Sequence, residues 1–145
     1  MYFVTGGAFN GKSKWVKAYT QLNEQKNYWY SAYNHDLFPE KVDEAFEGYV
    51  VLEGIEQWVR GWLKDVHAED VRKKWQAVLN QWQNWESHNR ERKVIFIGSD
   101  ITKGIVPIEP DDRVWRDVTG RVFQDTASKC ERVELIWYGM NRRLK

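Results

Sequence analysis

One glycine-rich loop near the start of the chain constrains its fold more than any other feature. Residues 6–13 read Gly-Gly-Ala-Phe-Asn-Gly-Lys-Ser, which is the pattern G-x-x-x-x-G-K-S. A short apolar, β-prone run over residues 1–5 comes directly before the loop, and a helix is expected directly after it. Glycines at these places let backbone N–H groups turn inward around an anion, so this order of strand, loop and helix predicts a phosphate-binding site.

The motif gives its polar residues distinct expected roles. The positive end of the following helix faces the same anion as the loop. Lys12 is expected to reach the β- and γ-phosphates of a nucleoside triphosphate, and the Ser13 hydroxyl is expected to ligate Mg²⁺. An ordinary strand–turn–helix junction is the alternative, and the position directly after the first strand disfavours it. The predicted nucleotide-binding residues are Gly6, Gly7, Ala8, Phe9, Asn10, Gly11, Lys12 and Ser13.

Composition and charge exclude several classes of protein. At 145 residues, 42% of them hydrophobic, we expect a single domain, 1–145, with a substantial core. A net charge of +1 does not indicate a nucleic acid partner, and no apolar run is long enough to span a bilayer. The first residues already form the expected strand, which leaves no room for a signal peptide. The single Cys130, expected between a helix and a strand, excludes an internal disulfide and predicts a cytoplasmic location.

Strand and helix signals alternate along the rest of the chain. Apolar runs predict strands over 27–34, 49–52, 93–98 and 133–138, with a returning edge strand over 139–145. Apolar spacing predicts helices over 11–22, over 56–87 with His67 as a candidate break, and from Asp111 or Asp112 as the cap to 128, with weaker helical character over 36–46. This alternation predicts an α/β fold, the P-loop NTPase fold, with a mostly parallel central sheet flanked by helices.

Tryptophan recurs at helical spacing over residues 56–87. The chain has nine tryptophans, an unusual number for its length. Trp75, Trp82 and the apolar positions between them predict core packing or a subunit contact rather than a cofactor site. Rings that prove to be exposed would favour an oligomer interface or a bulky planar ligand.

Acidic residues follow two of the predicted strands. Ligands of open α/β sheets bind beyond the carboxyl ends of the strands, where we expect segments 6–13, 34–36, 53–54 and 99–100 to meet. Glu53 and Asp100 lie in these segments, and either can hold metal-bound water or accept a proton from a substrate hydroxyl. An apolar strand that ends in an acid has the Walker B pattern, which favours Glu53. For Asp100 a solvated loop acid is an equally good interpretation.

Arginines and histidines provide further candidates. Arg113 and Arg116 share a face of the last predicted helix, and Arg121 is offset from them. Such arginines can clamp phosphates, although spacing alone favours surface charges paired with residues such as Asp117.

The three histidines form no metal-ligand spacing, and we expect His67 and His88 at the surface. His35 follows the second predicted strand, so it lies at the edge of the expected crevice. A histidine there can be a nucleophile or a phosphate ligand, and a loop histidine without a role is the favoured alternative.

Several segments together resemble one known family. Residues 5–13 resemble the T-G-G-x-x-S-G-K-S loop of the bifunctional adenosylcobinamide kinase / adenosylcobinamide-phosphate guanylyltransferase family. Residues 104–107 and 113–124 are similar, without a gap, to its G-I-V-P and R-x-x-R-D-x-x-G-R-x-N-Q motifs. Residues 51–53 resemble its L-L-E segment, and residues 138–145 resemble its C-terminal motif S-G-x-x-x-x-x-K. The resemblance therefore covers both ends and most of the chain.

This resemblance implies a P-loop α/β fold and a role in cobalamin assembly or salvage. Members of the family phosphorylate the aminopropanol hydroxyl of adenosylcobinamide with a nucleoside triphosphate. They then transfer GMP to that phosphate through a guanylylated histidine. The implied ligands are ATP or GTP, Mg²⁺ and a corrinoid substrate, and the implied assembly is a homo-oligomer, often a trimer.

Departures from the family pattern concentrate on the second of these steps. The family's R-I-x-x-H-x-x-x-R segment, which supplies the guanylylated histidine, has no counterpart between residues 33 and 49, where His35 matches no motif. The family's N-E pair after the fourth strand is Ser99-Asp100 here. Three further departures are Ile108 and Pro110 for a Glu and an Arg, and Phe123 for an Asn.

The sequence as a whole predicts a kinase of adenosylcobinamide whose guanylyltransferase step is reduced or lost. The alternatives are a degenerate, non-catalytic nucleotide-binding protein of the same fold and a P-loop kinase of another small molecule. Lys12 and Glu53 are the predicted catalytic residues, and Ser13 with Glu53 the predicted metal site. The candidate phosphate- or substrate-binding residues are Asp100, Arg113 and Arg121.

Overall fold

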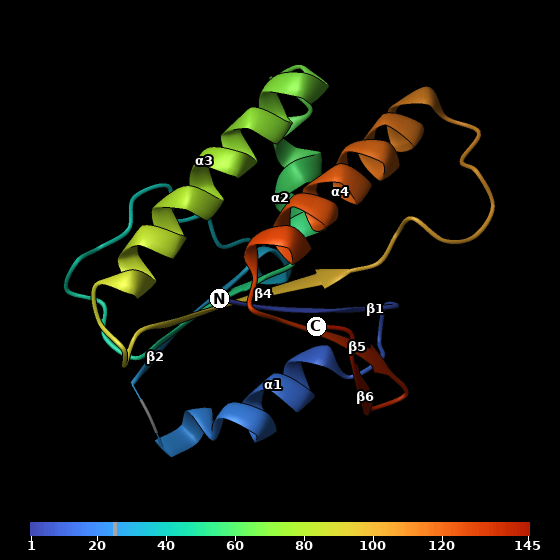
Figure 1. Ribbon diagram of the computed structural model, residues 1–145. Helices are drawn as coiled ribbons and strands as arrows, with labels where there is room; N and C mark the ends of the chain where they lie inside the picture. Colours follow the sequence, from blue (N-terminus) through green and yellow to red (C-terminus); the bar gives the residue numbers. More distant parts are fainter. Residues whose placement is uncertain (25) are drawn as a thin grey trace.

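A six-stranded sheet runs through the centre of the computed structural model, which describes residues 1–24 and 26–145 (Figure 1). The order of its strands is β2-β3-β4-β1-β5-β6, and only β6 runs antiparallel to its neighbour within these residues. The strands are β1 (Tyr2–Gly6), β2 (Asn27–Ser31), β3 (Tyr49–Glu53), β4 (Lys93–Ser99), β5 (Arg132–Trp137) and β6 (Met140–Arg143). The predicted mostly parallel α/β sheet is confirmed.

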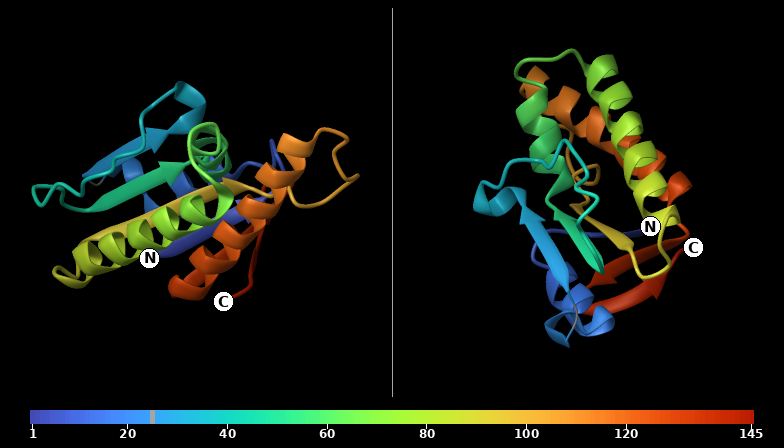
Figure 2. Two further views of the ribbon diagram at one scale, coloured as in Figure 1. Left: turned by 90° about the horizontal axis from the view of Figure 1, so that it is seen from above. Right: turned by 90° about the vertical axis from the view of Figure 1, so that its left-hand side faces the viewer.

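Helices cover both faces of the sheet in unequal numbers. Helix α1 lies against one face, and α2, α3 and α4 lie against the other (Figures 1 and 2). The α-helices are α1 (Lys12–Thr20), α2 (Ile55–Trp62), α3 (Ala68–Ser87) and α4 (Pro110–Lys129). Two short 3₁₀ helices, η1 (Leu22–Glu24) and η2 (Ala32–Asn34), flank β2. No helix in the described part of the chain has the length and apolar character needed to cross a bilayer.

The central strands form because their side chains are buried on both faces of the sheet. In β4 every residue from Val94 to Ser99 is buried, and the middle of β3 is buried as well. Such near-continuous runs of β-branched and aromatic residues are typical of strands that have helices on both sides. The edge strand β6 has every residue exposed, which agrees with its short length and polar sequence.

Tryptophan rings fill the core between the sheet and the three helices. Trp75, Trp82 and Trp85 of α3 are all fully buried. The ring of Trp75 lies 5.6 Å from that of Phe96 in β4, and its indole N–H donates to the Thr126 hydroxyl of α4 at 2.8 Å. The structure therefore places these tryptophans in the core. Their spacing reflects packing and not a subunit contact or a planar ligand.

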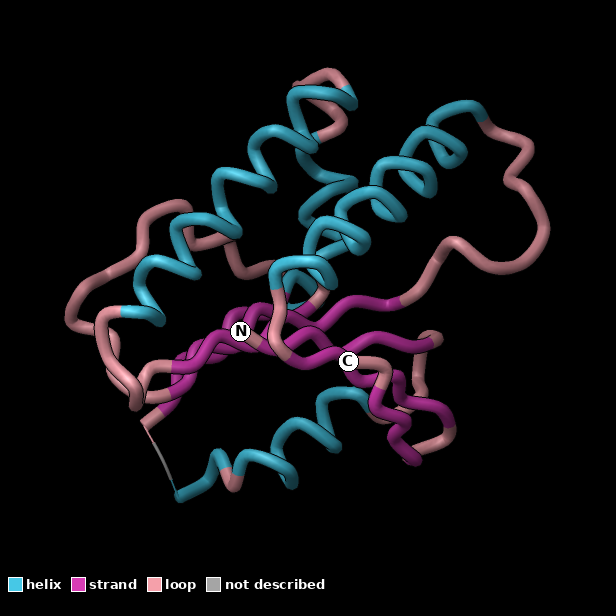
Figure 3. Tube along the Cα trace, in the orientation of Figure 1, coloured by secondary structure: helices cyan, strands magenta, loops and turns pink. Residues whose placement is uncertain are grey.

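The chain leaves two neighbouring strands in opposite directions. From β1 it passes through α1 to β2 at one edge, and from β4 it passes through α4 to β5 on the far side of β1. Since α1 and α4 lie on opposite faces, the loops after β1 and β4 diverge at the carboxyl ends of these strands (Figure 3). Open α/β sheets bind ligands in the crevice that such a divergence creates.

Most predicted elements are confirmed, with differences at their ends. The helical region over 56–87 breaks near His67, as predicted, into α2 and α3. The second strand stops at Ser31, because the chain turns there into η2. Residues 36–46 contain no helix, because Pro39 interrupts the segment; Phe38 and Phe46 pack on the core from a non-helical backbone.

The start of α4 also differs from the prediction. Glu109 occupies the N-cap position and makes no side-chain capping bond, and Pro110 is the first helical residue. Proline suits this position because its fixed φ is helical and no N–H partner is needed there. Asp111 and Asp112 lie in the first turn, where they interact favourably with the helix dipole, and neither is the cap.

Candidate functional site

The glycine-rich loop joins β1 to α1 and packs tightly against β5. Gly6 has a φ of 141°, and a β-carbon there would lie 2.1 Å from the carbonyl oxygen of Ile136. Only glycine fits this close approach. Gly11 precedes the helix with a left-handed φ of 87°. Between them, Ala8 and Phe9 form the exposed tip of the loop, and Asn10 bonds to the neighbouring hairpin.

Lys12 folds back into this loop from the first turn of α1. Its ammonium donates to the carbonyl oxygens of Gly7 at 2.8 Å and Gly6 at 3.2 Å, and the residue is only 7% exposed. Burial lowers the pKa of the Lys12 ammonium below its ordinary value, and the charges of Glu56 and Glu53 oppose this effect. The positive charge is therefore held inside the loop, in contact with two of its backbone carbonyl oxygens.

Ser13 of α1 and Glu53 of β3 meet on the face of the sheet that α1 covers. Val51 and Glu53 lie two residues apart on β3, and Val51 packs in the core beneath α1, so both side chains face α1. The Ser13 hydroxyl donates to one oxygen of Glu53, and the indole N–H of Trp29 donates to the other at 2.9 Å. Trp29 thereby fixes the orientation of the carboxylate that follows β3.

The chemistry of this pair is that of a hard-oxygen site. A hydroxyl and one carboxylate are the side chains that P-loop proteins offer to Mg²⁺, which takes its remaining ligands from water and phosphate. No cluster of three His, Cys, Asp or Glu side chains suited to a metal is found in residues 1–24 and 26–145. The oxygen donors Ser13 and Glu53 therefore fit a magnesium ion that is bound together with a nucleotide.

A second, buried carboxylate lies behind the loop. Glu56, in the first turn of α2, is 1% exposed. It accepts hydrogen bonds from the Tyr33 hydroxyl and from the backbone N–H of Ser99, the latter at 3.0 Å. Burial raises the pKa of Glu56, and the two hydrogen bonds and the Lys12 charge oppose the rise. This network joins the ends of β2 and β4 to α2.

Asp100 follows β4 and closes against the glycine-rich loop. Its backbone N–H donates to the carbonyl oxygen of Gly6 at 2.9 Å. Its carboxylate accepts from the Thr102 hydroxyl at 2.6 Å and from the Thr102 N–H at 2.9 Å. Burial alone would raise the pKa of Asp100, but these bonds and the Lys103 ammonium bring it below its ordinary value. Asp100 is therefore an ionised group at the edge of the site.

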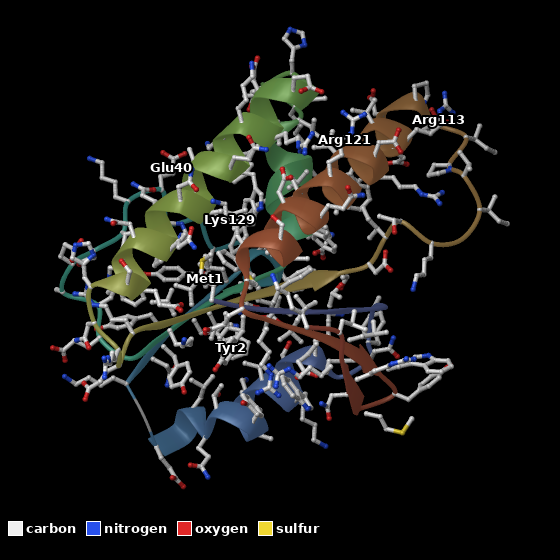
Figure 4. The ribbon with its side chains drawn as sticks, in the orientation of Figure 1. Met1, Tyr2, Glu40, Arg113, Arg121 and Lys129 are labelled. Atoms are coloured by element: carbon white, nitrogen blue, oxygen red, sulfur yellow. The ribbon has the colours of Figure 1, made fainter. Side chains whose placement is uncertain are left out.

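The arginines of α4 lie apart from the glycine-rich loop. Arg113 donates to the carbonyl oxygens of Pro107 and Ile108, and Arg121 pairs with Glu69 of α3 at 3.0 Å. Figure 4 shows Arg113 beside the loop that precedes α4 and Arg121 farther along the helix. The favoured interpretation as paired surface charges is confirmed for Arg121, whose partner Glu69 is exposed, and is wrong for Arg113 and Arg116, which bond to backbone carbonyl oxygens.

All three arginines nevertheless line one cavity. Its volume is about 760 Å³, and it reaches Asp100 and Thr5 at the carboxyl ends of β4 and β1. The arginines thus face the site from the side of α4, whereas Lys12 and Ser13 face it from the side of α1. Arg113 and Arg116 bond to backbone carbonyl oxygens, and Arg121 bonds to the Glu69 carboxylate. A guanidinium carries five N–H donors, more than these contacts within residues 1–24 and 26–145 use, so donors remain for a ligand.

His35 and Cys130 occupy separate positions. His35 has a left-handed φ of 64° after η2, is exposed, and lines another cavity with Tyr33, Asp36 and Trp58. Cys130 lies between α4 and β5, as predicted, and burial raises the pKa of its thiol to about 12. Among residues 1–24 and 26–145, no hydrogen bond joins either residue to the glycine-rich loop.

Residues 29–144 match the model of the family described as cobinamide kinase / cobinamide phosphate guanyltransferase, CobU. The chain belongs to this family. The family combines kinase and guanyltransferase activities in cobalamin biosynthesis, and it uses nucleoside triphosphates. The matched segment begins after the glycine-rich loop, so the loop is independent support for the same fold. A search of curated proteins found no match.

Two departures from the family motifs have structural reasons. Phe123, at the position of the family's Asn, packs on the backbone of Gly98 in β4, where a β-carbon would lie 2.4 Å from its ring. It also lies 5.1 Å from the ring of Phe3, edge to face. Phe123 is therefore a core residue here. Pro110 begins α4, as described above.

Sequence reasoning missed Trp29, Tyr33 and Glu56. Trp29 and Glu53 lie on adjacent parallel strands, but the register that brings their side chains together depends on the tertiary pairing of β2 with β3. Glu56 reads in the sequence as an ordinary acid in the first turn of a helix. The available signal was its position three residues after Glu53, behind the predicted crevice.

Proposed function

We propose that this chain is a Mg²⁺-dependent P-loop kinase that transfers the γ-phosphoryl group of a nucleoside triphosphate to the aminopropanol hydroxyl of adenosylcobinamide. The observation that carries the proposal is the convergence of Lys12, Ser13 and Glu53 at the end of β1, next to a cavity lined by family motifs. Family membership supports the corrinoid acceptor.

Each residue of the loop has a role in this proposal. The backbone N–H groups of 6–13 bind the triphosphate, and the Lys12 ammonium exchanges its carbonyl partners for phosphate oxygens, where it stabilises the transferring charge. Ser13 and Glu53 would hold Mg²⁺, which when bound neutralises phosphate charge. Trp29 keeps Glu53 in position.

The acceptor is proposed to bind on the α4 side of Asp100. Arg113 and Arg121 line the 760 Å³ cavity there, and their guanidinium groups suit the phosphate that the reaction places on the corrinoid. Asp100, ionised at the rim of both the loop and this cavity, is suited to accept a hydrogen bond from the attacking hydroxyl.

We propose that the guanylyl step is reduced or lost. The nearest candidate nucleophile by sequence, His35, lies in a cavity whose described lining includes no residue of the glycine-rich loop. A degenerate protein that binds nucleotide without turnover is the second candidate. It is favoured by the same departures, which remove a nucleophile and alter the loop before α4.

The homo-oligomer and the single domain also belong to the proposal. Ile105, Val106 and Ile108 of the loop before α4 are largely exposed, and such a group of apolar side chains is typical of a contact between subunits. Light scattering would give the mass of the assembly.

Turnover with the corrinoid tests the function. Wild-type protein is incubated with Mg²⁺, ATP or GTP, and adenosylcobinamide, and the corrinoid is analysed by mass spectrometry. We expect one added phosphate, and none with Lys12→Ala. Triphosphate binding without phosphorylated corrinoid would favour the degenerate protein, and phosphorylation of another alcohol alone would change the acceptor.

A further inference from the structure

We propose that the cavity between the glycine-rich loop and the β5–β6 hairpin holds the base of the nucleotide, with the Trp137 ring as its stacking surface. This inference rests on the proposed function, since it assigns the second half of the ligand whose phosphates the loop binds. Its stacking residue, Trp137, lies outside the segments that resemble the family motifs.

The cavity is continuous with the glycine-rich loop. Its volume is about 610 Å³, within the range of small-molecule sites. Gly6, Gly7 and Asn10 line it from the loop, and Trp137 and Met140 line it from the hairpin. A nucleotide whose phosphates lie on the loop therefore has its ribose and base within reach of the hairpin.

Direct hydrogen bonds fasten the hairpin to the loop. The N–H of Tyr138 donates to the side-chain oxygen of Asn10 at 3.2 Å, and the N–H of Gly139 donates to the backbone carbonyl oxygen of Asn10 at 2.9 Å. Tyr138 has a left-handed φ of 50°, which forms the tight turn of the hairpin. The loop and the aromatic wall are thus held at a fixed separation, a condition for binding one ligand at both ends.

Large apolar side chains are exposed at this wall. Trp137 is 62% exposed and Met140 is 65% exposed, in contrast to the buried tryptophans of α3. The Trp137 ring lies 5.4 Å from that of Tyr138, tilted by 31°, so the two rings support each other. Exposed, paired aromatic rings beside a phosphate-binding loop are suited to stack on a planar base.

The position of this cavity also keeps the nucleotide base apart from the proposed corrinoid site. The hairpin lies on the β5 side of β1, and Glu53 lies on the β3 side. The arginine cavity runs along α4 and reaches Val133 of β5, but within the described part of the chain it shares only Asp100 with the lining of the base cavity. A base bound at Trp137 leaves the γ-phosphate directed toward Asp100, which lines both cavities. Donor and acceptor can therefore be bound at the same time.

Binding of three ligands tests this inference. Dissociation constants of ATP, GTP and inorganic tripolyphosphate are measured by calorimetry with Mg²⁺ for wild type, Trp137→Ala and Trp137→Phe. We expect Trp137→Ala to weaken both nucleotides about tenfold, with tripolyphosphate unchanged, and Trp137→Phe to restore most of the affinity. Lys12→Ala, as the matched variant of the loop, should weaken all three ligands.

Other outcomes would overturn the base site. They are unchanged nucleotide affinity in Trp137→Ala, an equal loss for tripolyphosphate, or equal wild-type affinities for tripolyphosphate and nucleotides. A smaller assembly of Trp137→Ala in light scattering, with nucleotide affinity unchanged, would assign the exposed rings to a second copy of the chain. Tight nucleotide binding without corrinoid phosphorylation would overturn the proposed function and leave the base site standing.

Discussion

The glycine-rich loop and the face of α4 that carries Arg113, Arg116 and Arg121 border the same crevice. They differ in how firmly their polar side chains are held by neighbouring groups. Around the loop, the polar groups are bonded to one another: Lys12 to loop carbonyls, and Ser13 to Glu53. On α4, Arg113 is bonded to an exposed segment before the helix, and Arg121 to an exposed acid on α3.

This difference agrees with the proposed roles, chemistry for the glycine-rich loop and substrate binding for α4. Strand ends in a parallel sheet are fixed by the backbone ladder, so the residues there are preorganised, as transfer of a charged group requires. Guanidinium groups on a helix face, held by exchangeable partners, suit a substrate that arrives and leaves. We therefore expect loop variants to lower kcat and α4 variants to raise the KM of the acceptor.

The largest expected effect is that of Lys12→Ala. Removal of a buried, preorganised cation should lower kcat about 10²- to 10³-fold and weaken triphosphate binding. Lys14→Ala, which removes an exposed lysine of the same helix, is the matched control and should leave both unchanged. Equal steady-state kinetics of the two variants would contradict the proposed role of Lys12.

Glu53→Gln should have the next largest effect. The amide keeps the shape and can still accept from Ser13, but it removes the charge that faces the metal site. We expect kcat to fall about tenfold or more and half-saturation to require more Mg²⁺. Kinetics at graded Mg²⁺ concentrations provide the measurement, with Glu47→Gln, an exposed acid paired to Lys26, as the control. An unchanged Mg²⁺ dependence would remove Glu53 from the metal site.

Arg113→Ala should separate binding from chemistry. We expect the KM of adenosylcobinamide to rise about tenfold, the typical cost of a lost charged hydrogen bond, with kcat changed little. Arg90→Ala, in the turn before β4, is the control for loss of a surface charge. A fall in kcat at unchanged KM would place Arg113 with the loop rather than with the acceptor.

A smaller effect concerns stability and tests the buried carboxylate behind the loop. Because burial raises the folded-state pKa of Glu56 above its ordinary 4.5, ionisation costs more in the folded state. This loss of stability grows as pH rises from about 4.5 through the folded pKa. Glutamine at position 56 cannot ionise. The difference in unfolding free energy between Glu56→Gln and wild type should therefore shift in favour of the variant as pH rises, by at most about 1.4 kcal/mol per pH unit. Urea unfolding across this range gives the slope, and parallel curves would contradict the raised pKa.

The smallest effect is expected at Cys130. Its thiol, with a pKa of about 12, should not react with a thiol reagent in the native protein and should react after unfolding. Rapid labelling of native protein would show that the junction between α4 and β5 opens in the folded state. The end of α4 would then be less stably packed than the structure indicates.

Features that depend on a few neighbouring residues could be predicted from the sequence, whereas features that depend on distant contacts could not. The loop, β3 and β4 are fixed by local residue patterns, so their positions and the meeting of Gly6, Glu53 and Asp100 followed from sequence and from the geometry of parallel sheets. The core role of Trp75 and Trp82 was one of two predicted alternatives, and burial decided between them.

Other features depend on tertiary register. The bond from Trp29 to Glu53 requires β2 to pair with β3, and the partners of Arg116 depend on the path of the loop before α4. The failure of 36–46 to form a helix also reflects context, since Phe38 and Phe46 pack on the core from a backbone that is not helical.

The central claim, a retained kinase step without efficient guanylyl transfer, is tested most directly by the fate of two phosphorus atoms. Wild-type protein is incubated with adenosylcobinamide and GTP labelled either at the γ- or at the α-phosphorus. We expect the γ label to move to the corrinoid while the α label remains in GDP and unreacted GTP. Corrinoid that takes no γ label from GTP or from γ-labelled ATP, or that takes the α label at comparable yield, would contradict a retained kinase step without efficient guanylyl transfer.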